Sequence, residues 1–193
     1  MVLFKKIIFS IVSVLTCISC KQEARDTVKQ QEVINKDWKA RFNQTLLLLG
    51  HRNWIVVADK AFPQQNAAGM EVINTNEDLL PVLQYVLRQV NASSHVKPII
   101  YRDKELSFIT EDQAKGVKQF ANESQQLFNG QQIQTILHDS VFTKLDEASK
   151  LFKILVLKTN ETIPYTSVFL QLDCAYWGAD KERQLRINMN NNK

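Results

Sequence analysis

Residues 50–63 constrain the fold of this chain more than any other segment. They read Gly-His-Arg-Asn-Trp-Ile-Val-Val-Ala-Asp-Lys-Ala-Phe-Pro. Five apolar residues in a row, Trp54 to Ala58, are typical of a buried strand in a parallel sheet. His51 precedes this strand and Asp59 follows it. Open α/β sheets place ligands at the carboxyl ends of their strands, and an unpaired buried carboxylate is costly, so Asp59 is a candidate functional residue.

Strand and helix patterns alternate along most of the chain. The expected strands are residues 54–58, 70–73, 98–101, 132–137, 153–158 and 167–172. The expected helices are residues 33–49, 76–90, 110–128, 140–151 and 180–189. This alternation predicts an α/β fold, a three-layer Rossmann-like arrangement with a largely parallel sheet flanked by helices. Because no helix separates the last two strands, we expect them to be adjacent, either paired antiparallel or serving as an edge or an oligomer contact.

The N-terminal segment is typical of an export signal. Two lysines precede an apolar stretch too short to span a bilayer, so residues 1–19 are expected to be a signal peptide. The stretch ends in Ser19 and Cys20, and a small residue directly before a cysteine resembles a bacterial lipoprotein processing site. Cys20 would then carry a lipid, and residues 20–31 would tether the domain to the membrane. The alternatives are an ordinary signal peptide and an uncleaved anchor.

The rest of the chain has the size and charge of one folded domain. We expect this domain to cover residues 32–189 and to be followed by a disordered tail at 190–193. Removal of the export segment takes away two lysines and lowers the formal net charge from +4 to +2. A nearly neutral domain gives no support for nucleic-acid binding. The anchor predicts a location in the cell envelope, either periplasmic or on the outer surface.

The chain lacks the residues that phosphate-binding loops, metal sites and disulfide frameworks need. The chain has only five glycines, and none forms the GxGxxG or GxxxxGK[ST] pattern of a phosphate-binding loop. No CxxC lies beyond Cys20 and the histidines are far apart, so a metal site has no support. Cys174 is the only thiol left once Cys20 is lipidated, which excludes a disulfide framework. We therefore expect no cofactor and no metal.

Two groups of residues resemble a known family. The first is Leu49-Gly50-His51, then an apolar strand, then Asp59, Phe62 and Pro63. The second is Lys153-Ile154-Leu155-Val156-Leu157-Lys158-Thr159, a turn with Asn160-Glu161, and then Pro164-Tyr165-Thr166-Ser167. In order and spacing these groups resemble the RbsD/FucU family of ribose pyranases and fucose mutarotases, over about residues 44–173. The resemblance describes a divergent branch, because Ser167 stands where the family has a sugar-binding Asn.

The resemblance implies a reaction and two residue roles. Members of the family open and reclose the hemiacetal of a monosaccharide, which requires no metal and no nucleotide. The His of the Gly-His pair acts as a general acid or base, and the Asp holds and polarises sugar hydroxyls, which assigns these roles to His51 and Asp59. Imidazole suits proton transfer because its ordinary pKa of about 6.5 is close to the working pH. A histidine bonded to the end of the preceding helix and a turn-capping aspartate are the alternatives.

Further residues would complete such a site. The family has a sugar-contacting His or Arg near one helix start, where the alignment leaves His138 or Asp139. We favour His138 as a second acid/base group, because it ends an expected strand at the same edge as Asp59. Tyr165 is expected to contact a sugar hydroxyl, with a merely packed aromatic as the alternative. Ser167 keeps a hydroxyl that can donate and accept in place of the family Asn.

Three further candidate residues lie near strand ends. Lys158 ends another strand at the same edge and is a candidate sugar ligand, although a solvated lysine is the common alternative. Tyr176 and Trp177 would form a stacking wall for a sugar or an oligomer contact.

The leading interpretation is a membrane-tethered sugar mutarotase or pyranase. The resemblance implies a ring-shaped homo-oligomer whose sites are completed across subunit interfaces. A non-catalytic monosaccharide-binding lipoprotein is the alternative, which the loss of the family Asn motivates. A different aldose isomerase on the same scaffold is a third reading.

Overall fold

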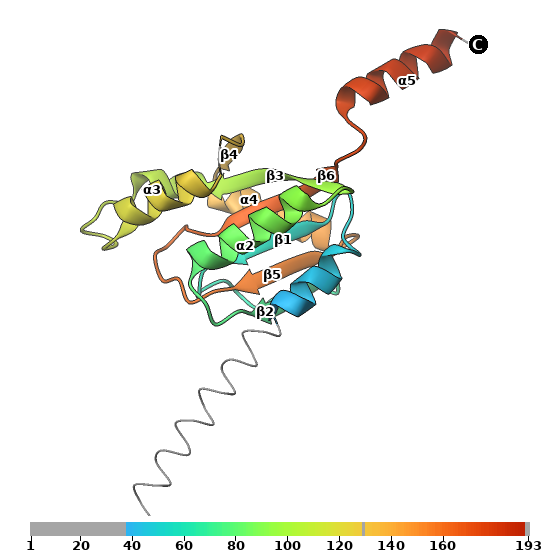
Figure 1. Ribbon diagram of the computed structural model, residues 1–193. Coiled ribbons are helices and arrows are strands. Elements are labelled where there is room, and N and C mark those ends of the chain that lie inside the picture. Colours follow the sequence, from blue (N-terminus) through green and yellow to red (C-terminus); the bar gives the residue numbers. More distant parts are fainter. Residues whose placement is uncertain (1–37, 129, 192–193) are drawn as a thin grey trace, which may run out of the picture.

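The computed structural model describes residues 38–128 and 130–191, which build one sheet with helices on both faces (Figure 1). The strands are β1 (Trp54–Ala58), β2 (Met70–Asn74), β3 (Val96–Asp103), β4 (Ile133–Ile136), β5 (Ile154–Lys158) and β6 (Val168–Cys174). The helices are one over residues 38–46, α2 (Leu79–Ala92), the short 3₁₀ helix η1 (Lys104–Phe108), α3 (Val117–Leu127), α4 (His138–Ser149) and α5 (Ala179–Asn191). The predicted α/β class is confirmed.

The sheet is largely parallel, and its order is β2-β5-β1-β6-β3-β4. The strands β2, β5 and β1 run parallel to one another, as do β3 and β4, while β6 runs antiparallel to both of its neighbours. The strands β1 to β5 therefore all end at one edge of the sheet, here called the carboxyl edge, and begin at the opposite amino edge. β6 runs from the carboxyl edge to the amino edge, since Val168 pairs with Arg102 and Cys174 pairs with Val96.

One detail of the predicted sheet needs correction. The strands β5 and β6 follow each other in sequence but do not pair, because β1 lies between them. A tight hairpin would need a loop of only a few residues. The connection over residues 159–167 is longer, so the chain passes the end of β1 and adds β6 on its far side.

The buried residues form a layer on each face of the sheet. Alternate side chains of a strand point to opposite faces, so Ile55 and Val57 of β1 join the core under α2 and α3, while Trp54 and Val56 join the core under α4. Every side chain of β1 is at most 3% exposed. Full burial stabilises the fold by about 1.5–3 kcal/mol for each Val or Ile, which explains why this strand is apolar on both faces.

Several element boundaries differ from the expected ones, among them the start of α3 and the end of β3. The sequence predicts a helix from Thr110, but α3 begins only after Gly116, whose φ of 89° ends the preceding turn in the left-handed region. The carboxylate of Glu111 accepts hydrogen bonds from the amides of Gly116 and Lys118 and holds this turn. The strand β3 continues beyond the expected end at Tyr101 and reaches the carboxyl edge with Asp103.

The C-terminal helix lies outside the domain core. The expected signal peptide, Cys20 and the tether fall outside the described residues. Within residues 38–128 and 130–191, no helix is both long enough and apolar enough to cross a bilayer. The helix α5 stands clear of the sheet beyond the end of β6 (Figure 1). It extends to Asn191, so the first half of the expected disordered tail is helical.

Candidate functional site

Side chains from several strand ends meet at the carboxyl edge. Asp59 follows β1, Asp103 ends β3, and His138 begins α4 just after β4. Tyr165 and Ser167 precede β6, which enters the sheet at this same edge. The structure also places Lys158, the last residue of β5, at this edge, as expected for Asp59, His138 and Lys158, and ligands of open α/β sheets bind there.

Asp59 is held by Ser167. The hydroxyl of Ser167 donates to Oδ2 of Asp59 at 2.9 Å and accepts a hydrogen bond from the Asp59 amide at 3.0 Å. The other carboxylate oxygen accepts from the amide of Ala61 at 2.9 Å, so Asp59 also caps the following turn. Ser167 is only 2% exposed. Its hydroxyl therefore positions Asp59 and leaves the carboxylate half-buried at the edge of the sheet.

His138 forms a pair with an aspartate that the sequence did not single out. Nδ1 of His138 lies 2.9 Å from Oδ2 of Asp103. The backbone amide of His138 donates to both oxygens of Glu105, each at 3.1 Å, which fixes the start of α4. The side chain of His138 is 37% exposed, whereas that of Asp103 is fully buried. Within the part of the chain that the structure describes, Nε2 of His138 has no hydrogen-bond partner.

Burial dominates the electrostatics of Asp103. It raises the pKa of this carboxyl from 3.8 to about 6, against the hydrogen bond and the charge of His138, which lower it. The nearby carboxylates of Glu105 and Asp59 add to the rise. Perturbed pKa values of this kind cluster at functional sites. The site thus combines an imidazole, a carboxyl of shifted pKa and a second carboxylate.

Tyr165 faces the imidazole from the β6 side. Its φ of 59° is left-handed, a conformation that costs an aromatic residue on the order of 1–3 kcal/mol. The hydroxyl of Thr166 donates to the carbonyl of Ile163 at 2.7 Å and holds the turn. The rings of Tyr165 and His138 meet edge to face with their centroids 5.1 Å apart. The strained turn therefore sets the tyrosine beside the candidate base.

Aromatic rings form one side of this region. The ring of Phe142, one turn into α4, lies with its centroid 4.7 Å from that of His138. It also stacks on Phe62 at 5.4 Å. Apolar walls with a few convergent polar groups are typical of small-molecule sites.

Two further predictions concern the carboxyl edge, the choice between His138 and Asp139 and the role of Lys158. Of the two alternatives near the start of α4, His138 contacts Asp103, whereas Asp139 is exposed. The helix begins at His138 and not at Ser140, so His138 lies on its first turn. Lys158 donates to the carbonyl of Phe62 at 2.8 Å, which joins the end of β5 to the loop after β1.

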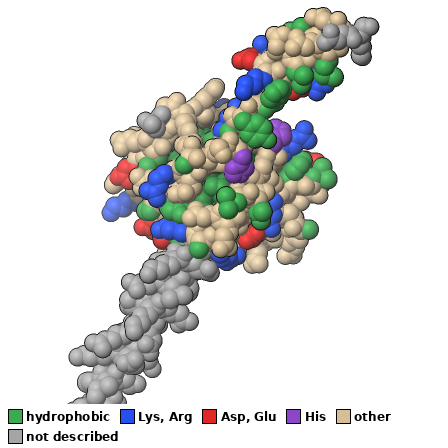
Figure 2. All heavy atoms as spheres, turned by 45° about the vertical axis from the view of Figure 1, so that its right-hand side comes forward, with side chains coloured by type: hydrophobic (Ala, Val, Ile, Leu, Met, Phe, Trp, Pro, Cys, Tyr) green, Lys and Arg blue, Asp and Glu red, His purple; other side chains and the backbone are tan. Residues whose placement is uncertain are grey.

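His51 and Tyr176 lie at the amino edge of the sheet, whereas Asp59 lies at the opposite, carboxyl edge. Nδ1 of His51 is 3.0 Å from Oδ1 of Asp173, and the ring is 55% exposed. The other oxygen of Asp173 is 3.4 Å from Nζ of Lys97. Burial acts to raise the pKa of Asp173, but hydrogen bonds from the Cys174 amide, His51 and Lys97 hold it below its usual value. Figure 2 views the molecule from the side on which α5 leaves it, and histidine side chains are visible on this face.

Two candidate residues were missed in the sequence, Asp103 and Glu105. The expected strand ended at Tyr101, so Asp103 fell in a loop. The rule that singled out Asp59 and Lys158, a charged residue at the end of an apolar strand, would have found Asp103 had the strand been extended. Glu105 acts through a backbone amide and has no comparable pattern in sequence. Among residues 38–128 and 130–191, no three His, Cys, Asp or Glu side chains are grouped as metal ligands would be.

Comparisons with known proteins place the chain in a family. A family model described as the RbsD / FucU transport protein family matches residues 29–174. Matching solved structures include RbsD of Bacillus subtilis complexed with D-ribose, at 22% identity and a TM-score of 0.47, covering 69% of this chain and 91% of that chain. FucU from Bifidobacterium longum matches at 15% identity and a TM-score of 0.46, covering 69% of this chain and 94% of that chain.

A third match is the fucose mutarotase from Streptococcus pneumoniae in complex with L-fucose, at 21% identity and a TM-score of 0.48, covering 67% of this chain and 89% of that chain. None of the curated protein sequences compared with the chain matches it. The family model covers most of the chain and confirms the resemblance found in the sequence. The chain belongs to the RbsD / FucU transport protein family.

Proposed function

We propose that the chain is a monosaccharide mutarotase or pyranase, which interconverts anomers or ring forms by general acid/base catalysis. The observation that carries this proposal is the His138–Asp103 pair, with Nδ1 engaged at 2.9 Å and Nε2 left unpaired among the described residues. The half-buried carboxylate of Asp59 lies at the same edge of the sheet. Family membership supports the assignment.

The reaction needs one group to accept a proton and one to donate a proton. In the proposed mechanism, Nε2 of His138 takes the proton of the anomeric hydroxyl. The bond between the anomeric carbon and the ring oxygen breaks, the ring oxygen is protonated, and an open-chain aldehyde forms. Reclosure on the other face reverses these transfers and gives the other anomer. Asp103 stabilises the imidazolium that forms on His138, while Asp59 and Tyr165 hold sugar hydroxyls.

His51 can take part only if a second copy supplies it. It precedes β1 and Asp59 follows β1, so the length of this five-residue strand, about 16 Å at 3.3 Å for each residue, separates them within one chain. We propose that the amino edge of one copy packs against the carboxyl edge of the next and brings His51 to the His138 site as the proton donor. Such head-to-tail contacts are heterologous and close into rings when the rotation allows it.

A non-catalytic monosaccharide-binding protein is the second candidate function. The observation that favours it is that the Ser167 hydroxyl already makes two hydrogen bonds to Asp59. It donates one to the carboxylate and accepts one from the backbone amide. A site that lacks a free side chain at this position has lost one contact to the sugar. Such a protein would bind a sugar without accelerating its exchange.

The experiment that separates the two functions is NMR exchange spectroscopy on the purified full-length protein. Ribose, fucose, fructose, galactose, arabinose and rhamnose are each tested with the parent protein and with His138→Gln. Asp139→Asn is the matched control, because it alters a neighbouring charged residue that does not contact Asp103. Accelerated exchange with one sugar, lost in His138→Gln and kept in the control, supports the mutarotase. Sugar binding without acceleration by the parent supports the binding protein.

We also propose that the chain is lipid-anchored through Cys20 in the cell envelope. The proposal rests on the apolar segment before Ser19 and Cys20. Metabolic labelling with a radioactive fatty acid tests it. Label in the parent and none in Cys20→Ala supports the anchor, and an unlabelled parent contradicts it.

A further inference from the structure

The helix α5 packs against no other element among the residues that the structure describes. None of its residues is buried, and its apolar side chains Leu185, Ile187 and Met189 are 40%, 46% and 51% exposed. Figure 2 shows apolar and basic side chains on α5 where it stands away from the body. An isolated helix of this length is marginal in water, so another surface is needed to stabilise it. The family match ends at Cys174, which makes α5 an addition to the family domain.

One face of α5 is apolar with basic neighbours. Leu185 and Met189 are one turn apart and therefore lie on the same face. Lys181 lies one turn before Leu185 on this face, and Arg186 borders it. Asp180 pairs with Arg183 at 3.2 Å and Glu182 with Arg186 at 2.7 Å, so Lys181 is the one charged side chain of α5 without an ion pair among the described residues.

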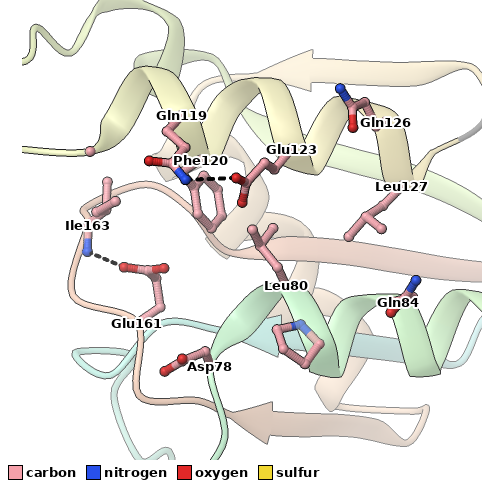
Figure 3. Close-up of a pocket in the computed structure, with 12 residues that line it drawn as sticks. Asp78, Leu80, Gln84, Gln119, Phe120, Glu123, Gln126, Leu127, Glu161 and Ile163 are labelled. Atoms are coloured by element: carbon pink, nitrogen blue, oxygen red, sulfur yellow. Dashed lines mark hydrogen bonds between the residues drawn. The ribbon is translucent and has the colours of Figure 1, made fainter.

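A groove of complementary character lies between α2 and α3 (Figure 3). It has a volume of about 620 Å³. Leu80 from α2 and Phe120 and Leu127 from α3 are directed into the space between the helices (Figure 3). The charged residues that line it are all acidic: Asp78, Glu123 and Glu161. None of the residues of the proposed sugar site lines this groove.

We propose that α5 of one copy docks in the α2/α3 groove of a neighbouring copy. Leu185 and Met189 would enter between Leu80 and Leu127, and Lys181 would meet Glu123. The lengths agree, because 13 residues of α5 span about 20 Å and 11 residues of α3 span about 16 Å at 1.5 Å for each residue. Contact between an apolar face and an apolar groove, with opposite charges at the border, favours this occupant.

The position of the groove suits a head-to-tail arrangement. Asp78 precedes α2, and Glu161 lies in the loop between β5 and β6, so both mark the end of the groove at the carboxyl edge. The helix α5 follows β6, which ends at the amino edge. Contact between the amino edge of one copy and the carboxyl edge of the next brings α5 to this end of the groove. The choice of a neighbouring copy rests on the proposed function, whereas the fit of α5 to the groove does not.

Photocrosslinking of the full-length protein tests the docking. A benzophenone side chain replaces Met189 in one variant, and Gln184, on another face of α5, in the control. The expected result is a crosslinked dimer from position 189, with the linked peptide in α2 or α3, and much less product from position 184. A link within one chain, a link to another surface, or no link would overturn the proposal.

Charge reversal tests the same contact in a second way. Glu123→Lys and Lys181→Glu should each lower the yield of dimer from position 189 by roughly two- to fivefold, as expected for an exposed ion pair. The double variant should recover it. If neither single variant changes the yield of crosslinked dimer, the proposed pairing of Lys181 with Glu123 is wrong. The crosslink does not depend on catalysis, so a crosslinked dimer from a parent protein that accelerates no sugar exchange would show that the docking holds while the proposed function fails.

Discussion

Nδ1 of His138 lies 2.9 Å from Oδ2 of Asp103, which joins the first turn of α4 to the end of β3. When Asp103 is ionised, it accepts a hydrogen bond from the N–H at Nδ1 and so fixes the imidazole tautomer, which leaves Nε2 as the acceptor. The other carboxylate oxygen, Oδ1, is buried without a hydrogen-bond partner among the described residues. The same buried carboxyl therefore orients the candidate base and carries an electrostatic cost.

Replacement of the pair should remove catalysis while the fold is kept. We expect His138→Gln to lower the rate of sugar exchange by about 10²- to 10⁴-fold, the usual contribution of a general acid or base. Asp103→Asn should act through His138 and alter the pH profile, because the parental rate should rise as Asp103 ionises near pH 6. Exchange rates between pH 5 and 8, with circular dichroism as a check on folding, measure both effects. If the exchange rate of Asp103→Asn rises with pH in the same way as that of the parent protein, Asp103 does not have this role.

The stability of the protein should depend on pH through Asp103. Its pKa is raised from 3.8 to about 6, so between these values the folded protein keeps a proton that the unfolded chain has released. The free energy of unfolding should therefore fall as the pH rises from 4 to 6, by up to about 3 kcal/mol, and this contribution should be constant above pH 6. Chemical denaturation at several pH values measures it. The decrease should be absent in Asp103→Asn and present in Asp139→Asn, and equal slopes in all three proteins would refute the prediction.

Ser167 should matter for stability and for sugar affinity together. Ser167→Ala removes the donor to Asp59 Oδ2 and the acceptor of the Asp59 amide, which should lower the free energy of unfolding by about 1–3 kcal/mol. A less well-held Asp59 should also raise KM. Ser140→Ala, at an exposed position on α4, is the matched control and should change neither value. If Ser167→Ala behaves like this control, the hydroxyl does not position Asp59.

Mixed oligomers can show whether two edges build one site. His51→Ala and His138→Ala should each be inactive alone, but random co-assembly should restore about a quarter of the parental activity, because some interfaces then join two intact edges. A mixture of His138→Ala and Asp103→Asn is the control and should show no more than the mean activity of the two variants, since both residues belong to the same edge and co-assembly cannot restore that edge. No recovery in the first mixture, in oligomers shown to be mixed by mass spectrometry, would exclude a shared site.

The sequence predicted those parts of the molecule that depend on local patterns. The strand β1 was predicted with its observed ends, because a short apolar run between polar residues is typical of a strand that is buried on both faces. The sheet order was not predictable in this way, because the position of β6 depends on which strand edges remain free after β5 has paired with β1. The start of α3 was missed because Glu111 and Gly116 form a turn where side-chain propensities alone favour a helix.

The candidate site was predicted in part for the same reason. Asp59, His138 and Tyr165 lie beside recognisable strand ends or turns, and the structure places them at one edge. Asp103 became visible only with the full length of β3, and its shifted pKa depends on burial that no local pattern contains. The separation of His51 from Asp59 could have been foreseen, since a strand that connects two residues also holds them apart.

The antiparallel strand β6 has a consequence for biosynthesis. It lies in the middle of the sheet although it is the sixth strand in sequence, and it alone joins the half formed by β2, β5 and β1 to the half formed by β3 and β4. Until the ribosome has released residues 168–174, β1 and β3 each carry an open edge that can pair with other chains. A nascent chain that cannot close its sheet early remains unfolded for longer, and the free edges of β1 and β3 stay available to other chains during that time.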